Sequence, residues 1–128
     1  MRIKLNSILL FFQIGLTINV IAQKGPDSIV GNWVSSDGVR TVRVYKEKDK
    51  YKADIIKSNN PEETGKLILW DLVYDAEARE WNNGQIKLPG MAHEMDCYIK
   101  MMSLDLIKIT GYHGLRVLGK SELYYKSQ

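Results

Sequence analysis

The sequence predicts an all-β domain of many short antiparallel strands, arranged either as an up-and-down barrel or as a sandwich. Two observations indicate this fold class. Beyond the first two dozen residues, apolar and polar side chains alternate with a period of two through most of the chain, which is typical of half-buried strands. Turn-forming residues interrupt the alternation at short intervals, so the strands are short and follow one another closely.

The N-terminal residues predict a cleaved signal peptide, residues 1–22. Arg2 and Lys4 precede an apolar stretch that ends at Ala22, a small residue of the kind required at a signal-peptidase site. An uncleaved membrane anchor is the competing interpretation, but polar side chains interrupt the stretch and a spanning helix needs about 20 apolar residues. We therefore expect residues 23–128 to form a single β domain that is periplasmic or secreted and not inserted in a membrane.

The predicted mature chain is nearly neutral. Removal of the signal peptide takes away two basic residues and no acidic residue, so the formal charge falls from +3 to +1. This balance provides no basic surface for nucleic acid or an anionic membrane, and we expect neither as a partner. Cys97 is the only cysteine, so no disulfide within the chain can support the fold.

Six segments carry the strand pattern, five by alternation and one, residues 66–74, by a more continuous apolar run. They are residues 40–46, 51–57, 66–74, 95–102, 104–112 and 120–126. Turns are predicted at residues 36–38, 48–50, 59–61, 82–84 (Asn-Asn-Gly), 89–90 and 114. Residues 75–80 could close one helical turn, but six residues are too few for a stable helix unless packing holds them.

Several short motifs carry a family resemblance. They are Ile29-Val30-Gly31-Asn32-Trp33, residues 42–45, Asn60-Pro61, residues 81–84, Gly111-Tyr112-His113-Gly114 and residues 119–126. Together they resemble the uncharacterised bacterial family known as domain of unknown function 2147, over essentially the whole mature chain. The resemblance implies a secreted, calycin-like, up-and-down barrel related in shape to lipocalins. It implies no established activity.

The chain departs from this family pattern where the family carries polar residues. The pattern has a strand reading I-Y-D-P, then a glycine, a tyrosine before the cysteine, and an arginine before the later Gly-Tyr. The corresponding residues here are Lys87, Leu88, Ala92, Met95 and Thr110. If the family's polar residues form a site, this chain has lost most of it.

Barrel closure predicts a contact at one end of the domain. In a closed barrel the last strand can pair with the first, which would bring Lys126 to the face of Trp33. We predict that Trp33 closes one barrel end with Lys126 over it. In the alternative, Trp33 is an ordinary buried aromatic of the first strand and Lys126 is a solvated residue near the C-terminus.

The sequence offers no clear catalytic or metal-binding constellation. His93 and His113 lack the closely spaced companions of a zinc site, so we expect no metal and no other cofactor. Cys97 lies on the apolar side of its strand and is interpreted as a small core residue rather than a nucleophile. A nucleophile elbow and a phosphate-binding glycine loop are both missing from the sequence. Enzymatic activity is left open, and a non-enzymatic function is favoured.

Large aromatic side chains favour a binding function. A barrel of about eight strands can be filled by its own side chains or can hold one small ligand. We expect Trp70, Tyr98, Tyr112 and His113 to contact a small, largely apolar ligand in the barrel. Adaptable surface is expected from the methionines Met95, Met101 and Met102.

The alternative is a cell-envelope protein-interaction module with a filled barrel, no ligand and an exposed apolar patch, whose partner is unknown. A hydrolase, the third class, would require a nucleophile and a base that converge in a cleft.

Overall fold

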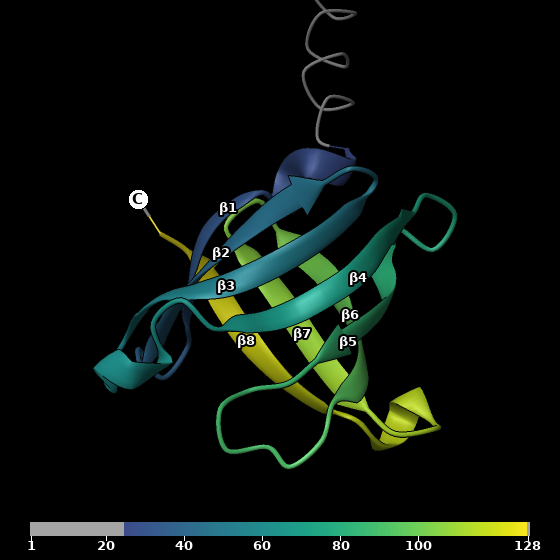
Figure 1. Ribbon diagram of the computed structural model, residues 1–128. Coiled ribbons are helices and arrows are strands. Elements are labelled where there is room, and N and C mark those ends of the chain that lie inside the picture. Colours follow the sequence, from purple (N-terminus) through teal and green to yellow (C-terminus); the bar gives the residue numbers. More distant parts are fainter. Residues whose placement is uncertain (1–24, 128) are drawn as a thin grey trace, which may run out of the picture.

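Eight antiparallel strands form a closed barrel in the computed structural model, which describes residues 25–127 (Figure 1). The strands are β1 (Gly31–Ser35), β2 (Arg40–Glu47), β3 (Lys50–Ser58), β4 (Leu67–Asp75), β5 (Glu80–Ile86), β6 (Met95–Ser103), β7 (Leu106–Tyr112) and β8 (Lys120–Lys126). Three short 3-10 helices are η1 (Pro26–Ile29), η2 (Pro61–Glu63) and η3 (Arg116–Leu118). Each strand pairs with the next and β8 pairs with β1, which confirms the up-and-down barrel over the sandwich.

The predicted signal peptide, residues 1–22, lies outside the described residues. Within residues 25–127, none of the helices has the length and apolar character needed to cross a membrane.

Period-two alternation places the core inside the barrel, as predicted. Val42 and Val44 on β2 are fully buried, and so are Ala53 and Ile55 on β3, while the residues between them are more exposed. The neighbouring strands are in register, with Val42 opposite Ile55 and Val44 opposite Ala53. Burial of apolar surface stabilises the fold by about 25 cal/mol per Å², so these cross-strand pairs hold the two strands against the interior.

The predicted turn at residues 82–84 is wrong, because these residues lie inside β5. The register of β5 against β6 shifts between Trp81 and Gly84, which marks a β-bulge, and Asn83 has a positive φ of 58°. Asn and Gly tolerate this geometry at a bulge as well as at a turn, so the sequence pattern is ambiguous. Gly84 is required here because a Cβ atom would lie 2.5 Å from Leu72 Cδ2.

The reversal between β4 and β5 occurs a few residues earlier, within residues 75–80, where the sequence also permits one helical turn. Asp75 Oδ1 accepts hydrogen bonds from the backbone N–H groups of Glu77 and Ala78, at 3.1 and 3.0 Å. An Asp that bonds the backbone two and three residues ahead stabilises a turn in place of a helix. The segment is therefore a hairpin turn.

The seam between β1 and β8 confirms the predicted contact at the barrel end. Trp33 is fully buried and pairs in register with Lys126, whose Nζ lies 5.5 Å from the centroid of the indole ring. That distance is within the range of a cation–π interaction. The last strand thus closes the barrel and places its terminal cation over the aromatic residue of the first strand.

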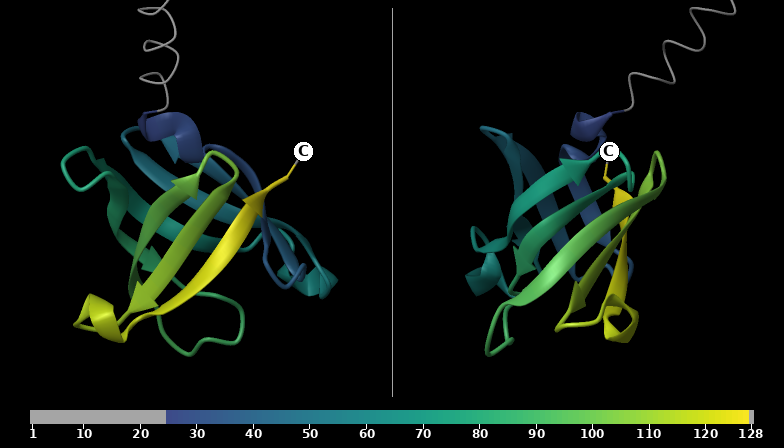
Figure 2. Two further views of the ribbon diagram at one scale, coloured as in Figure 1. Left: turned by 180° about the vertical axis from the view of Figure 1, so that it is seen from behind. Right: turned by 90° about the vertical axis from the view of Figure 1, so that its right-hand side faces the viewer.

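Helix η1 covers this end of the barrel. The indole Nε1 of Trp33 donates to the Ile29 carbonyl at 2.9 Å, and that of Trp81 donates to the Pro26 carbonyl at 3.0 Å. The Tyr51 hydroxyl donates to Asp27 Oδ1 at 2.6 Å. Figures 1 and 2 show η1 at one end of the barrel and the loop between β5 and β6 at the opposite end. Because η1 covers one end, the interior is reached from the end with the β5–β6 loop.

Candidate ligand-binding site

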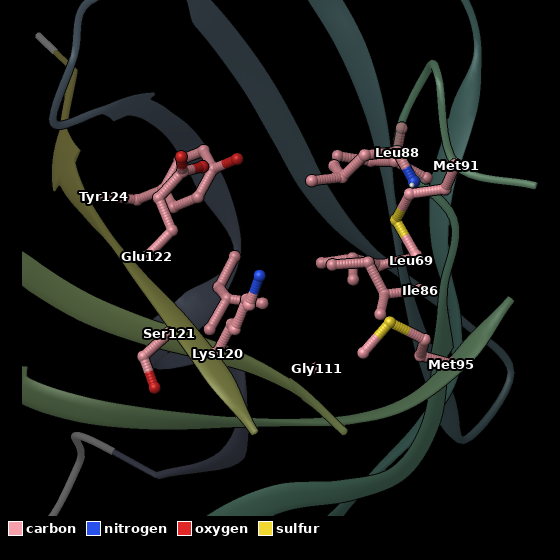
Figure 3. Close-up of a pocket in the computed structure, with 12 residues that line it drawn as sticks. Leu69, Ile86, Leu88, Met91, Met95, Gly111, Lys120, Ser121, Glu122 and Tyr124 are labelled. Carbon is pink, nitrogen blue, oxygen red and sulfur yellow. Dashed lines mark hydrogen bonds between the residues drawn. The ribbon is translucent and has the colours of Figure 1, made fainter. Parts of the chain in front are cut away.

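A cavity of about 390 Å³ occupies the barrel interior on the side away from η1. We call it the interior cavity (Figure 3). Its lining residues come from β4 to β8 and from the β5–β6 loop. They are Ile68, Leu69, Ile86, Leu88, Met91, Met95, Ile109, Gly111, Lys120, Ser121, Glu122 and Tyr124. The volume lies within the range of pockets that hold small organic ligands.

One side of the interior cavity is an apolar wall. Leu69, Ile86, Leu88, Met91 and Met95 lie together on this side in Figure 3. Leu88 and Met91 belong to the β5–β6 loop, where the Leu88 backbone N–H donates to the Met91 sulfur at 3.2 Å. This contact fixes the position of the Met91 thioether, and thioethers adapt to ligands of different shape.

Gly111 on β7 preserves the width of the interior cavity next to this wall. A Cβ atom at this position would lie 3.2 Å from Ile86 Cγ2 and 3.3 Å from Met95 Cε. Both distances are shorter than an ordinary carbon–carbon contact of about 3.5–4.0 Å. A side chain at position 111 would therefore push against the apolar wall and reduce the space for a ligand.

The opposite side of the interior cavity is a polar strip on β8, formed by Lys120, Glu122 and Tyr124. These residues share the inward face because they alternate with Ser121 and Leu123. Tyr124 is almost completely buried, and this burial, with the Glu122 carboxylate beside it, raises the pKa of the Tyr124 hydroxyl above its ordinary value. Tyr124 is therefore neutral at physiological pH and can donate a hydrogen bond.

The four residues expected to contact a ligand lie outside the interior cavity. Trp70 lines a second recess of about 370 Å³, which shares Ile68 and Leu88 with the interior cavity. Tyr98 and Tyr112 stand on the outer face, with ring centroids 6.0 Å apart, and His113 is exposed at the end of β7. The structure thus brings Tyr98 and Tyr112 together and leaves Trp70 elsewhere, and a ligand role for these residues stays a prediction.

An ion pair between Arg116 and Glu80 lies beside Tyr98 and Tyr112. The Arg116 guanidinium lies 3.9 Å from the Tyr98 ring centroid and hydrogen-bonds both carboxylate oxygens of Glu80. Glu80 is 2% exposed and is also bonded by Asn82, with Lys100 Nζ at 3.7 Å. These partners, Arg116 first among them, lower the pKa of Glu80. The cluster therefore fixes the β7–β8 loop on the outer surface of the barrel.

Sequence reasoning missed the polar strip, although a pattern for it was present. The prediction that Lys126 faces Trp33 places position 126 on the inward side of β8, and alternation then puts positions 120, 122 and 124 on the same side.

The three methionines expected to provide adaptable surface lie in different surroundings. Met95 lines the interior cavity, Met101 is partly buried, and Met102 is 54% exposed. Two of the departures from the family pattern, Leu88 and Met95, belong to the apolar wall.

Cys97 does not supply the interior cavity with a nucleophile. Cys97 is fully buried, and burial raises the pKa of its thiol to about 12, so the thiol is protonated and unreactive. Residues 25–127 contain no group of three or more His, Cys, Asp or Glu side chains placed to hold a metal ion. The arrangement suits binding by burial and hydrogen bonding.

Comparison with known proteins gives a family and a fold. A family model described as "Uncharacterized protein conserved in bacteria (DUF2147)" matches residues 31–126. Among solved structures, the barrel is similar to protein HP1028 from Helicobacter pylori, described as belonging to the lipocalin family. The TM-score is 0.63 at 14% identity, over 78% of this chain and 83% of that chain. No curated protein matches the sequence. At this identity, the structural likeness shows the fold alone.

Proposed function

The chain belongs to the DUF2147 family of uncharacterised bacterial proteins, and we propose that it is an exported binding protein that holds a small, largely apolar ligand inside its lipocalin-like barrel. The observation that carries this proposal is the interior cavity of about 390 Å³, with its apolar wall. Apolar surface transferred from water to such a wall contributes about 25 cal/mol per Å², so burial supplies the affinity.

Closure of the far end of the barrel supports the same function. The hydrogen bonds from Trp33 and Trp81 hold η1 over the far end of the barrel. A ligand that enters past Leu88 and Met91 therefore meets a covered end. Concave, largely pre-formed sites of this kind are typical of small-molecule binding.

The proposal of export rests on the sequence of residues 1–22. Its basic start, apolar stretch and small residue at Ala22 are those of a secretory signal peptide. A periplasmic or secreted barrel would meet apolar compounds that need shielding from water. N-terminal sequencing of the protein recovered from its own periplasm tests this part, and we expect the mature chain to begin at Gln23.

Fluorescence of Nile red, an apolar dye that brightens when shielded from water, tests binding in the interior cavity. Leu88→Asp places a carboxylate in the apolar wall, and Leu104→Asp makes the same change in the exposed β6–β7 turn at the opposite end of the barrel. We expect Leu88→Asp to weaken binding of Nile red about tenfold or more, because the dye would have to cover a charge. Leu104→Asp should bind like the wild type. Equal binding by both variants, or no binding by the wild type, would contradict the proposal.

One observation supports the alternative function of a protein-interaction module. Leu115, Val117 and Leu118 in the β7–β8 loop are 64%, 86% and 75% exposed. Apolar side chains gathered at a loop in this way occur at protein interfaces. Photo-cross-linking from position 117 in intact cells tests this alternative. A specific partner that is lost on Leu118→Ser would support it, whereas cross-links to many unrelated proteins would count against it.

A further inference from the structure

One carboxylate oxygen in the interior cavity lacks a hydrogen-bond donor. Glu122 Oε1 is buried and has no hydrogen-bond partner within residues 25–127, although the Tyr124 hydroxyl lies beside the same carboxylate. Arg40, whose charge acts on Glu122, is itself held by Glu63 with an Nε–Oε1 distance of 3.0 Å. A buried acceptor without a donor is unfavourable, so a ligand N–H or O–H placed here gains an interaction that the protein does not provide.

Lys120, on the same strand, sets a second requirement for the head group of a ligand. It precedes Glu122 by two residues on the inward face of β8, a separation of about 7 Å along the strand. Figure 3 shows its amino group turned toward the cavity. An ammonium group only donates hydrogen bonds. A head group that satisfies both side chains must therefore accept at Lys120 and donate at Glu122.

The two charges together disfavour charged head groups. A ligand carboxylate paired with Lys120 would lie close to the Glu122 carboxylate, and a ligand ammonium paired with Glu122 would lie close to the Lys120 ammonium. Like charges repel most strongly at the buried Glu122 oxygen and less strongly at Lys120, which is exposed to water. A neutral group that both donates and accepts avoids either repulsion.

We propose that the interior cavity selects an uncharged amphiphile, whose donor-and-acceptor head group, of the alcohol or primary amide kind, bridges Glu122 and Lys120. Its hydrocarbon chain lies along Leu69, Ile86 and Met95 on the facing apolar wall. This inference rests on the proposed function and specifies the class of ligand. It also gives the polar strip a role that an apolar ligand alone would leave unexplained.

Competition against bound Nile red tests the head group with four compounds that share one chain: octanamide, octanol, octanoate and octylamine. We expect octanamide and octanol to displace the dye at concentrations about tenfold below those of the two charged compounds. Glu122→Gln removes the negative charge and keeps the shape, so octanoate should gain and its disadvantage should fall to about threefold or less. Lys120→Met should do the same for octylamine. Thermal melting of both variants establishes that they fold.

The outcomes separate this inference from the proposed function. If Nile red does not bind the wild type, the proposed function fails and the inference fails with it. If the dye binds and octanoate or octylamine competes as well as octanamide, the head-group inference is wrong and the binding function stands. Selectivity that is unchanged in Glu122→Gln and Lys120→Met would also overturn the inference, because the two charges would then play no part.

Discussion

Replacement of Gly84 by alanine tests the bulge in β5 that replaces the predicted turn. The new Cβ would lie 2.5 Å from Leu72 Cδ2, 2.6 Å from Leu72 Cγ and 3.1 Å from Cys97 Sγ. Ordinary contacts between such atoms are about 3.5–4.0 Å. The Leu72 side chain must therefore move away from the new Cβ by about 1 Å. Leu72 and Cys97 are both fully buried, so moving either side chain would disturb the packed core.

Overpacking of a well-filled core costs about 1–3 kcal/mol, and two contacts below 3.0 Å place Gly84→Ala toward the upper end. For a domain of about 100 residues, a loss of 2 kcal/mol lowers the Tm by roughly 8–16 °C. Urea unfolding and thermal melting followed by circular dichroism measure both quantities. Gly25→Ala is the control, because nothing lies within 4 Å of its added Cβ, and it should change stability by less than about 0.5 kcal/mol. A Gly84→Ala variant as stable as this control would refute the packing described for β5.

Three further predictions follow from other contacts. Lys126→Met removes the cation from the face of Trp33 and should lower the unfolding free energy, measured by urea unfolding, by no more than about 1 kcal/mol. A larger loss would contradict a role limited to this cation–π contact. Arg116→Met removes the first partner of the buried Glu80 and should cost about 1–2 kcal/mol at neutral pH, with allowance for the 41% exposure of the Arg116 side chain. The folded pKa of Glu80 lies below its ordinary value of 4.5, so this stabilisation is present above pH 4.5 and is lost as the pH falls through the folded pKa. The unfolding free energies of the wild type and Arg116→Met should therefore converge in acid. A difference that stays constant with pH would contradict the ion pair. Cys97 should resist Ellman's reagent at pH 8 in the folded protein and react only after unfolding in urea, and fast labelling of the native state would contradict its burial.

Local pattern in the sequence was sufficient for most of the barrel. β8 was predicted with the observed bounds of Lys120–Lys126, and the alternation in β2 and β3 placed the buried apolar residues of both strands correctly. The pairing of Trp33 with Lys126 was also accessible, because closure of an up-and-down barrel leaves the first and last strands as partners. These features depend on strand periodicity and order, which one sequence contains.

The pattern failed where one motif serves two backbone geometries. Asn82-Asn83-Gly84 reads as a turn because Asn and Gly accept positive φ, yet the same property suits a bulge inside a strand. Deciding between them requires knowing that Gly84 packs against Leu72, a contact between different strands. Strand β5 was missed for this reason.

The ligand role predicted for Trp70, Tyr98, Tyr112 and His113 stays a prediction, whereas the interior cavity was not located from the sequence. Tyr98 and Tyr112 are large aromatics on correctly predicted strands, yet alternation from Cys97, on the apolar side of its strand, already turns the adjacent Tyr98 to the outer face. Residues Met95 and Gly111 on the same strands turn inward and line the interior cavity, while the two tyrosines turn outward. Residue type favoured the tyrosines, whereas the register decides the position, as a shift of one residue exchanges the two faces.

Native mass spectrometry of the mature protein, residues 23–128, purified from its own periplasm beside a denatured control, tests the central claim most directly. If the barrel binds a small, largely apolar molecule in the interior cavity, the native spectrum carries an added mass that denaturation releases, and the released compound is an uncharged amphiphile. A folded, monomeric protein without any added mass in repeated preparations would contradict the binding function.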